Sequence, residues 1–287
     1  MSVYIHGGLR SPIGVLNGQY KHMRPEILGS QVIDEIINRY SISHIDGIFC
    51  GNAVGTGGNL GRLMGLMCNL PNYVPAITVD MQCASALMSI EIAYAHIVSG
   101  IMDSAIAGGI ESSSLQPERV YASGDDREGP YKVAQFTPQD QSPLAMLEGA
   151  ERTIHKHNVT KEDLYPHIIG SHQRASAALD NPYLQSYIMP ITIDGKRCID
   201  ECIRPTMNEK LLSRMKPLLG ADSITNAGNA CLTHDGAAFV YLSNKKGPFK
   251  IHSVKPWAGN PQFSPEGALE STEAILKRTG LTMDDID

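Results

Sequence analysis

The sequence has no long apolar run, no excess of positive charge and no paired cysteine spacing. No stretch of its 287 residues approaches the length of about 20 apolar residues that a membrane-spanning helix needs. With 24 Lys and Arg against 30 Asp and Glu, the net charge of −6 argues against a general nucleic-acid or anionic-membrane surface. Cys198 and Cys202 are one residue too far apart for a Cys-x-x-Cys zinc motif. We therefore expect no nucleic-acid, membrane or metal partner.

Two further signals are missing. The glycine-rich segment 51–58, GNAVGTGG, has neither the Gly-x-x-x-x-Gly-Lys-Ser/Thr nor the Gly-x-Gly-x-x-Gly pattern of nucleotide-binding loops, so we interpret it as a loop. The N-terminus runs from Met1 directly into an expected strand, without a basic and then apolar leader. Scattered cysteines are typical of reduced thiols. Together these features predict a cytoplasmic protein.

In the first third of the chain, expected strands alternate with expected helices, as in an α/β protein. A hydrophobic content of 42% with 19% charged residues is ordinary for a globular protein. Alternation of strands and helices is typical of parallel crossover units and of a sheet covered on both faces. The expected strands span 3–6, 45–50, 78–81 and 103–107, and the expected helices span 25–40, 60–69 and 84–99.

The stretch 78–114 contains the strongest candidate for chemistry. Its helix over 84–99 is apolar nearly all round, which predicts a buried helix, and Gly100 supplies a left-handed stop. We expect Cys83 at the first residue of this helix, where the unpaired N–H groups and the helix dipole favour the nucleophilic thiolate. The alternative interpretation of Cys83 is a small buried hydrophobic residue.

Beyond Ser114 the pattern changes to a mostly helical insertion over 115–223. Residues 115–143 are rich in turn formers, and a strand returns only over 237–243. Within the insertion we expect a helix over 144–157, a helix over 161–179 behind a Thr160-x-x-Asp163 capping box, a short hairpin over 191–195, and a helix from a second capping box, Thr206-x-x-Glu209, to about Pro217.

From Phe249 the chain begins a second, similar pattern. Strand 250–254 and a helix from Ser264-Pro265 to Arg278, capped by Gly280, match the start of the chain and indicate an internal repeat. We therefore predict three parts: a first half over 1–114 plus 224–246, an inserted domain over 115–223, and the start of a second half over 247–287. We expect this second half to continue past Asp287.

Several short motifs occur in order along the chain. They are Arg10-Ser-Pro-Ile-Gly, Gly51-Asn52 with Arg62 downstream, Val79-x-x-x-Cys83-Ala-Ser, Gly100-x-x-Asp103, Ala107-Gly-Gly-x-Glu111-Ser and Asn229-x-x-x-x-x-Asp235-Gly-Ala-Ala. In this order and spacing, they resemble the thiolase family. The resemblance implies a layered α/β/α/β/α fold of two similar halves, with mixed, mainly parallel sheets and an inserted, mostly helical loop domain.

The resemblance also implies acyl-coenzyme A chemistry at Cys83. In the family, a cysteine at this place accepts an acyl group. The acyl-enzyme then serves Claisen condensation to a 3-ketoacyl-CoA such as acetoacetyl-CoA, or arises in the reverse thiolytic cleavage. A thiolate suits attack on a thioester carbonyl, and the Cys83 N–H is expected to help form an oxyanion hole. Asp80, usually Asn in the family, is expected to cap the turn.

Coenzyme A contacts are implied at four residues. The coenzyme A thioester is the substrate, and no permanently bound cofactor is expected. Met146 resembles a pantetheine contact, Arg204 resembles an arginine at the adenine or its phosphate, and Ala227 and Cys231 lie in the segment 226–231 that contacts the coenzyme. Met146 could equally be an ordinary packing residue and Arg204 a surface charge.

Departures from the family pattern leave two alternatives open. Family members usually carry other residues at Ala86, Ser113, Asn226 and Cys231. Their catalytic Asn, activating His and second Cys would lie past Asp287, so the chain as given is expected to be inactive as a complete acyltransferase. The alternatives are a non-catalytic coenzyme A-binding or partner subunit and a ketoacyl-synthase-like condensing enzyme. Family membership implies a homodimer or homotetramer.

Overall fold

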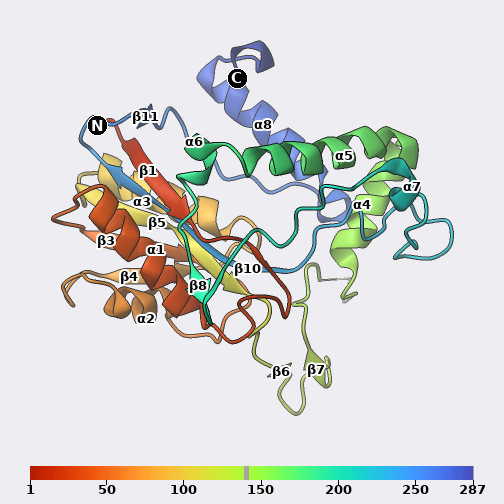
Figure 1. Cartoon of the computed structure of the whole chain (residues 1–287), viewed down its shortest axis with the longest axis horizontal. Helices are drawn as coiled ribbons and strands as arrows, with labels where there is room; N and C mark the ends of the chain where they lie inside the picture. The colour runs from red at the N-terminus through yellow and green to blue at the C-terminus, as the bar shows by residue number, and fades with distance from the viewer. Residues whose placement is uncertain (139–141, 287) are drawn as a thin grey trace. The chain divides into compact units, whose positions relative to one another are not determined.

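The computed structural model describes residues 1–138 and 142–286 (Figure 1). Residues 139–141, in the predicted insertion, and Asp287, in the predicted second half, lie outside the described residues. The chain forms two compact units from interleaved segments. Unit 1 comprises residues 1–117, 178–202 and 233–254, and unit 2 comprises residues 118–177, 203–232 and 255–287.

Unit 1 is built on a seven-stranded sheet with the order β11-β1-β10-β5-β3-β4, in which β2 also pairs with β10. Each expected strand overlaps an observed strand, but β1, β5 and β10 are longer than the sequence pattern predicted, and only Phe249–Lys250 forms a strand where 250–254 was expected. The strands are β1 (Tyr4–Arg10), β2 (Gly14–Val15), β3 (Gly47–Gly51), β4 (Ala76–Val79), β5 (Ser104–Ser112), β10 (His234–Ser243) and β11 (Phe249–Lys250).

The sheet is mixed, as predicted, but it is not mainly parallel. Strand β3 pairs in parallel with β4 and β5, whereas β10 pairs antiparallel with β1, β2 and β5, and β1 pairs antiparallel with β11. The reason lies in the connection between β5 and β10. The chain leaves the sheet after Ser112 and re-enters it at Asp235, which pairs with Ser112. Strand β10 therefore runs antiparallel to β5, and no crossover connection is needed.

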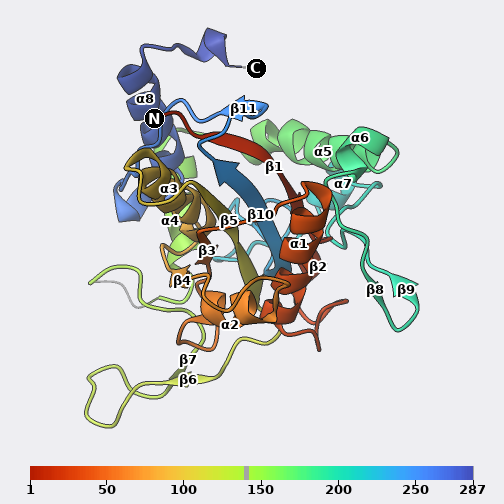
Figure 2. The ribbon, with the colours of Figure 1, turned by 90° about the vertical axis from the view of Figure 1, so that its left-hand side faces the viewer.

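Helices cover both faces of this sheet, as the alternating pattern predicted (Figure 2). Helices α1 (Pro25–Arg39) and α2 (Leu60–Met67) pack on one face, and α3 (Ser85–Val98) packs on the other. The remaining elements of unit 1 are the short helix α6 (Pro182–Gln185) and a hairpin of β8 (Thr192–Ile193) and β9 (Lys196–Arg197), which the sequence predicted over 191–195.

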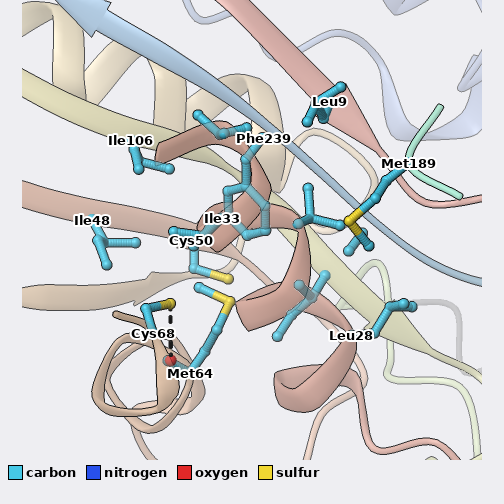
Figure 3. Packing of buried hydrophobic residues seen from close by; sticks show 14 of the residues in the cluster. Leu9, Leu28, Ile33, Ile48, Cys50, Met64, Cys68, Ile106, Met189 and Phe239 are labelled. Atoms are coloured by element: carbon cyan, nitrogen blue, oxygen red, sulfur yellow. Dashed lines mark hydrogen bonds between the residues drawn. The ribbon is translucent and has the colours of Figure 1, made fainter. Parts of the chain in front are cut away.

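The larger core cluster lies under α1 and α2. Leu28 and Ile33 of α1 are buried together with Met64 of α2, and Figure 3 shows Met64 beside Cys50 and Cys68. Burial raises the pKa of both thiols to about 12. Cys50 and Cys68 are therefore protonated core residues and not candidate nucleophiles.

Helix α3 differs from the prediction of a helix buried all round. Its buried side chains are Ser85, Ser89, Ala93 and Ile97, which recur every four residues and face the sheet. Leu87 is 72% exposed. An apolar composition cannot distinguish a helix with one contact face from a fully enclosed helix, because the exposure of its other faces depends on which elements pack around it.

Arg10, the last residue of β1, makes an internal ion pair. Its guanidinium donates two hydrogen bonds to the Asp200 carboxylate at 2.8 and 2.7 Å, and the N–H of Ile13 donates to the same carboxylate at 2.7 Å. Burial alone would raise the pKa of Asp200, but these donors outweigh it and hold that pKa below its usual value. The pair ties the segment 178–202 to the first strand of unit 1.

Replacing Asp200 by Asn is expected to lower the free energy of unfolding by about 3 kcal/mol at pH 7, because Arg10 loses its counter-charge in a partly buried place. Because the pKa of Asp200 is lower in the folded state than in the unfolded state, its ionised form stabilises the fold above about pH 3.9, the unfolded-state pKa. This contribution is lost as the pH falls through the folded-state pKa. The difference between variant and wild type should therefore shrink below about pH 4. Urea unfolding over a pH series measures it.

The matched control is Glu35→Gln. Glu35 pairs with Arg39 at 3.2 Å on the surface of α1, where an exposed pair contributes less than about 0.5 kcal/mol. A stability difference for Asp200→Asn that stays constant from neutral to acid pH would rule out the ion pair as its cause.

Unit 2 is mostly helical, as expected for the insertion. Thr160 and Asp163 form the expected capping box, with the Asp163 carboxylate 2.8 Å from the Thr160 N–H. The elements are the two-stranded sheet of β6 (Arg119–Val120) and β7 (Pro130–Tyr131), the helices α4 (Ala145–Lys156), α5 (Lys161–Ala178), α7 (Glu209–Leu212) and α8 (Glu266–Thr279), and the 3-10 turns η1 (Pro261–Phe263) and η2 (Met283–Asp285).

The second predicted capping box is wrong. Asn208, not Thr206, caps α7, and its side chain accepts from the Leu211 N–H at 3.0 Å. The helix ends at Leu212, well before Pro217. Asn is as good an N-cap as Thr, so two adjacent candidates could not be separated by residue type. No helix within residues 1–138 or 142–286 is long and apolar enough to cross a membrane.

Candidate active site

Cys83 lies in the turn between β4 and α3, at the carboxyl end of the parallel strands. The first residue of α3 is Ser85 and its N-cap is Ala84, so Cys83 precedes the helix by two residues and is not its first residue as predicted. Helix boundaries read from sequence are commonly off by this much. The Cys83 side chain is exposed, unlike those of Cys50, Cys68 and Cys198.

Two side chains near Cys83 determine the conformation of the turn. The Asp80 carboxylate accepts from the Gln82 N–H at 2.8 Å, which matches its predicted capping role. The Ser85 hydroxyl accepts from the Met81 N–H at 2.8 Å and donates to the Gln82 carbonyl at 2.6 Å. Gln82 has a φ of 51°, a left-handed conformation that non-glycine residues rarely adopt. The residue before the thiol is thus held in a strained conformation by its neighbours.

The first turn of α3 packs directly against the backbone of β3. A Cβ atom at Gly51 would come within 2.6 Å of both the Ala86 nitrogen and the Ser85 carbonyl carbon. A Cβ atom at Gly109 of β5 would come within 2.9 Å of the Gly51 oxygen and 3.2 Å of the Ala86 Cβ. Two glycines in adjacent strands therefore allow the helix start, and the turn that carries Cys83, to approach the sheet.

A buried polar network lies at the same edge of the sheet. The Asn52 amide donates to the Glu111 carboxylate at 2.8 Å, and the N–H groups of Ala53 and Val54 donate to the other oxygen of that carboxylate at 2.9 and 3.1 Å. Burial raises the pKa of Glu111, against the opposing effect of these donors. The Gly-Asn and Gly-x-Glu motifs thus hold the glycine-rich loop 51–58 against β5.

Asp235 has a structural role that does not involve its neighbour His234. Asp235 is 1% exposed, and one of its carboxylate oxygens accepts from the Ser114 N–H at 2.9 Å and the Ser112 hydroxyl at 3.3 Å. It joins the start of β10 to the end of β5. The Asp-Gly-Ala-Ala motif therefore stabilises the point where the chain leaves and re-enters the sheet.

The arrangement at Cys83 is suited to nucleophilic attack on a carbonyl. The thiol is accessible, and the N–H of Cys83 has no hydrogen-bond acceptor in the described part of the chain. A free N–H at the base of a helix can donate to a developing oxyanion. Cys83 is thus the thiol of unit 1 that combines access with an unused backbone donor.

The four predicted coenzyme A contacts all belong to unit 2, whereas Cys83 belongs to unit 1. Met146 is the second residue of α4 and is 46% exposed. Arg204 is exposed, and its N–H donates to His172 Nδ1 at 3.2 Å. Ala227 and Cys231 are also exposed.

Glu151 is a residue of this region that the sequence analysis missed. It lies on α4, is 9% exposed, and accepts hydrogen bonds from Ser223, Ile224 and Thr225. The structure thereby joins α4, which carries Met146, to the segment that carries Ala227 and Cys231. A sequence signal existed, since an acidic residue on the buried side of an amphipathic helix needs donors from elsewhere. Among the residues the structure describes, no group of three metal-ligating side chains is gathered.

Comparison with known proteins points to one family. The family model described as "Thiolase, N-terminal domain" matches residues 3–246. Staphylococcus epidermidis has a relative described as "Putative acetyl-CoA C-acetyltransferase VraB", 31% identical over 298 residues, which cover 97% of this chain and 76% of the relative. A relative with the same description from Staphylococcus aureus is 29% identical, over 97% of this chain and 77% of its own length.

Solved structures agree on the fold. The crystal structure of the Bacillus anthracis acetyl-CoA acetyltransferase matches with a TM-score of 0.86 at 23% identity, over the whole of this chain and 78% of that one. The human mitochondrial 3-ketoacyl-CoA thiolase in complex with CoA matches with a TM-score of 0.90 at 24% identity, with the same coverage. The predicted α/β thiolase fold is confirmed, and the chain spans about three quarters of the length of the proteins it matches. From the family-model match over most of its length, together with these relatives, we conclude that the chain belongs to the thiolase family.

Proposed function

We propose that this thiolase-family chain accepts an acyl group from acyl-coenzyme A on Cys83. The Cys83 sulfur attacks the thioester carbonyl carbon, the tetrahedral intermediate collapses, and the bond between that carbon and the coenzyme A sulfur breaks. Coenzyme A leaves as its thiol after taking up the proton that the Cys83 thiol has lost. The acyl-enzyme then supplies the acyl group for condensation to a 3-ketoacyl-CoA such as acetoacetyl-CoA, or forms in the reverse, thiolytic direction.

The observation that carries this proposal is the environment of Cys83. Its thiol is accessible, and its N–H has no acceptor among residues 1–138 and 142–286, in a turn held by Asp80 and Ser85. Such a donor stabilises the oxyanion of the tetrahedral intermediate by about 3 kcal/mol. The relatives described as acetyl-CoA C-acetyltransferases support acyl-CoA as the substrate class.

Coenzyme A is proposed to bind at the exposed residues of unit 2. Met146 would contact the pantetheine, Arg204 the adenine or its phosphate, and Ala227 and Cys231 the thioester arm. All four side chains are accessible; Ala227 lies within a turn that has its own hydrogen-bond network, and Cys231 follows that turn. The homo-oligomeric state and the cytoplasmic location stay predictions.

Trapping of the acyl-enzyme tests the proposal. The chain is incubated with radiolabelled acetyl-CoA, quenched in acid and digested, and the label is expected on the peptide that contains Cys83. Prior alkylation of exposed thiols should abolish labelling, and unlabelled acetyl-CoA present during alkylation should protect Cys83. Binding of coenzyme A without any labelling would instead favour a non-catalytic subunit. Labelling from an acyl carrier protein thioester alone would favour a ketoacyl-synthase-like enzyme.

A further inference from the structure

Glu151 of α4 is a buried carboxylate whose partners lie in a single short segment of unit 2. One oxygen accepts from the Ile224 N–H at 2.8 Å. The other oxygen accepts from the Thr225 N–H at 2.9 Å, the Thr225 hydroxyl at 2.5 Å and the Ser223 hydroxyl at 3.0 Å. Both oxygens of the carboxylate are thus committed to three consecutive residues.

These donors keep Glu151 ionised. Burial alone would raise its pKa, but the Thr225 hydroxyl and the two backbone N–H groups outweigh burial and leave the pKa below its ordinary value. Hydrogen bonds to an ionised acceptor are about twice as strong as those between neutral groups. Among residues 1–138 and 142–286, the basic side chain that lies within 4 Å of it is His155, one turn further along α4, whose Nε2 lies 3.3 Å away and which is largely exposed. The segment 223–225 is therefore held chiefly by hydrogen bonds to one charge.

The next residues form a turn that depends on this anchor. The Asn226 N–H donates to the Asn229 side chain at 2.7 Å, and the Asn226 side chain accepts from the Gly228 N–H at 2.8 Å. The Asn229 amide donates back to the Ile224 carbonyl at 3.0 Å. Thr225 and Asn226 are buried, whereas Ala227 at the tip is exposed. The segment 223–229 is thus a rigid turn with a buried base and an accessible tip.

We propose that Glu151 is a positioning residue for coenzyme A binding, which it serves by fixing the turn 223–229 against α4. This inference rests on the proposed function, in which Ala227, Cys231 and Met146 contact the coenzyme. Met146 lies on the same helix as Glu151, so the carboxylate sets the turn relative to the helix that offers the pantetheine contact. A turn ordered before binding costs less entropy when the ligand binds, and its loss weakens binding without removing any contact residue.

The test is Glu151→Gln, which keeps the shape of the side chain but removes its charge and turns one acceptor into a donor. Two quantities are measured on the whole chain: hydrogen exchange of the Ile224 and Thr225 amides without ligand, and the dissociation constant of free coenzyme A by calorimetry. We expect exchange of both amides to accelerate at least about tenfold and coenzyme A binding to weaken about tenfold, as for the loss of one charge-assisted hydrogen bond. Glu151→Asp, which restores the charge, should recover part of both.

Glu266→Gln is the matched control. Glu266 is also a carboxylate of unit 2, and it accepts from Lys156 at 2.9 Å and His157 at 2.7 Å at the C-terminal end of α4. Within the described residues it has no hydrogen bond to the turn 223–229. It should leave the exchange of Ile224 and Thr225 and the affinity for coenzyme A unchanged. Where Glu151→Gln does not fold, Thr225→Val removes one donor to Glu151 in an isosteric way and should shift both quantities in the same direction.

Each result tests a different step of the proposal. Unchanged exchange of Ile224 and Thr225 in a folded Glu151→Gln variant overturns the fixing of the turn. Accelerated exchange with unchanged coenzyme A affinity overturns its role in binding. Failure of the wild-type chain to bind coenzyme A counts against the proposed binding residues and against this role of Glu151, while the exchange data still decide whether Glu151 fixes the turn.

Discussion

Replacement of Cys83 by Ala is expected to abolish acyl transfer, with a loss of more than about 10⁴-fold, because the proposed acyl-enzyme bond forms at the Cys83 sulfur. The measurement is isotope exchange between acetyl-CoA and free labelled coenzyme A. This exchange requires only acylation of Cys83 and its reversal, so it reports the proposed half-reaction without the condensation step. Cys83→Ser should retain only a trace of exchange, since a hydroxyl without an adjacent base is a poor nucleophile.

Folding controls separate this loss from a structural effect. Because the Cys83 side chain is exposed, its removal should change the free energy of unfolding by less than about 0.5 kcal/mol. Leu87→Ala changes an exposed side chain of α3, the helix that follows Cys83, without removing a thiol, and should leave exchange within about twofold. Exchange in Cys83→Ala within about tenfold of wild type would assign the nucleophile elsewhere.

The secondary structure of unit 1 could be predicted from local patterns because its signals are local. Pro25 at the first position of α1 and Gly100 with a φ of 75° after α3 both have the roles that the sequence indicated. Strand β5 is the exception, since it continues through Gly108 and Gly109 to Ser112. These glycines look like a strand end in sequence, yet they lie where the backbones of neighbouring strands approach β5, a cause that only the assembled sheet reveals.

Non-local features account for the remaining errors. The direction of β10 depends on where a long connection returns, and the exposure of Leu87 depends on which elements pack around α3. Predictions for the candidate site also succeeded where the feature is local and failed where it is not. Local patterns correctly predicted the capping role of Asp80. Glu151 could not be assigned from sequence because its partners follow more than 70 residues later.

The packing of α3 on β3 makes Gly51 the second position of large expected effect. The expected effect does not come from the backbone conformation of Gly51, because this residue has an ordinary φ and lies in a regular strand. What matters is that an added Cβ would meet the Ala86 nitrogen and the Ser85 carbonyl carbon at 2.6 Å. Both are backbone atoms at the helix start and cannot rotate away, so the first turn of α3 has to move.

Gly51→Ala is therefore expected to destabilise the protein by about 3 kcal/mol and to slow acetyl-CoA exchange about 100-fold, because a displaced helix start moves Cys83 and its N–H together. Urea unfolding and the exchange assay measure the two effects. Gly65→Ala is the matched control, since its Cβ would meet the flexible end of Ile48 at 3.2 Å and the gain in helix propensity of about 1 kcal/mol offsets the crowding. Loss of stability in Gly51→Ala with full exchange activity would mean that the turn at Cys83 keeps its geometry independently of the helix, and the hydrogen bonds of Ser85 and Asp80 would then have to be sufficient to hold it.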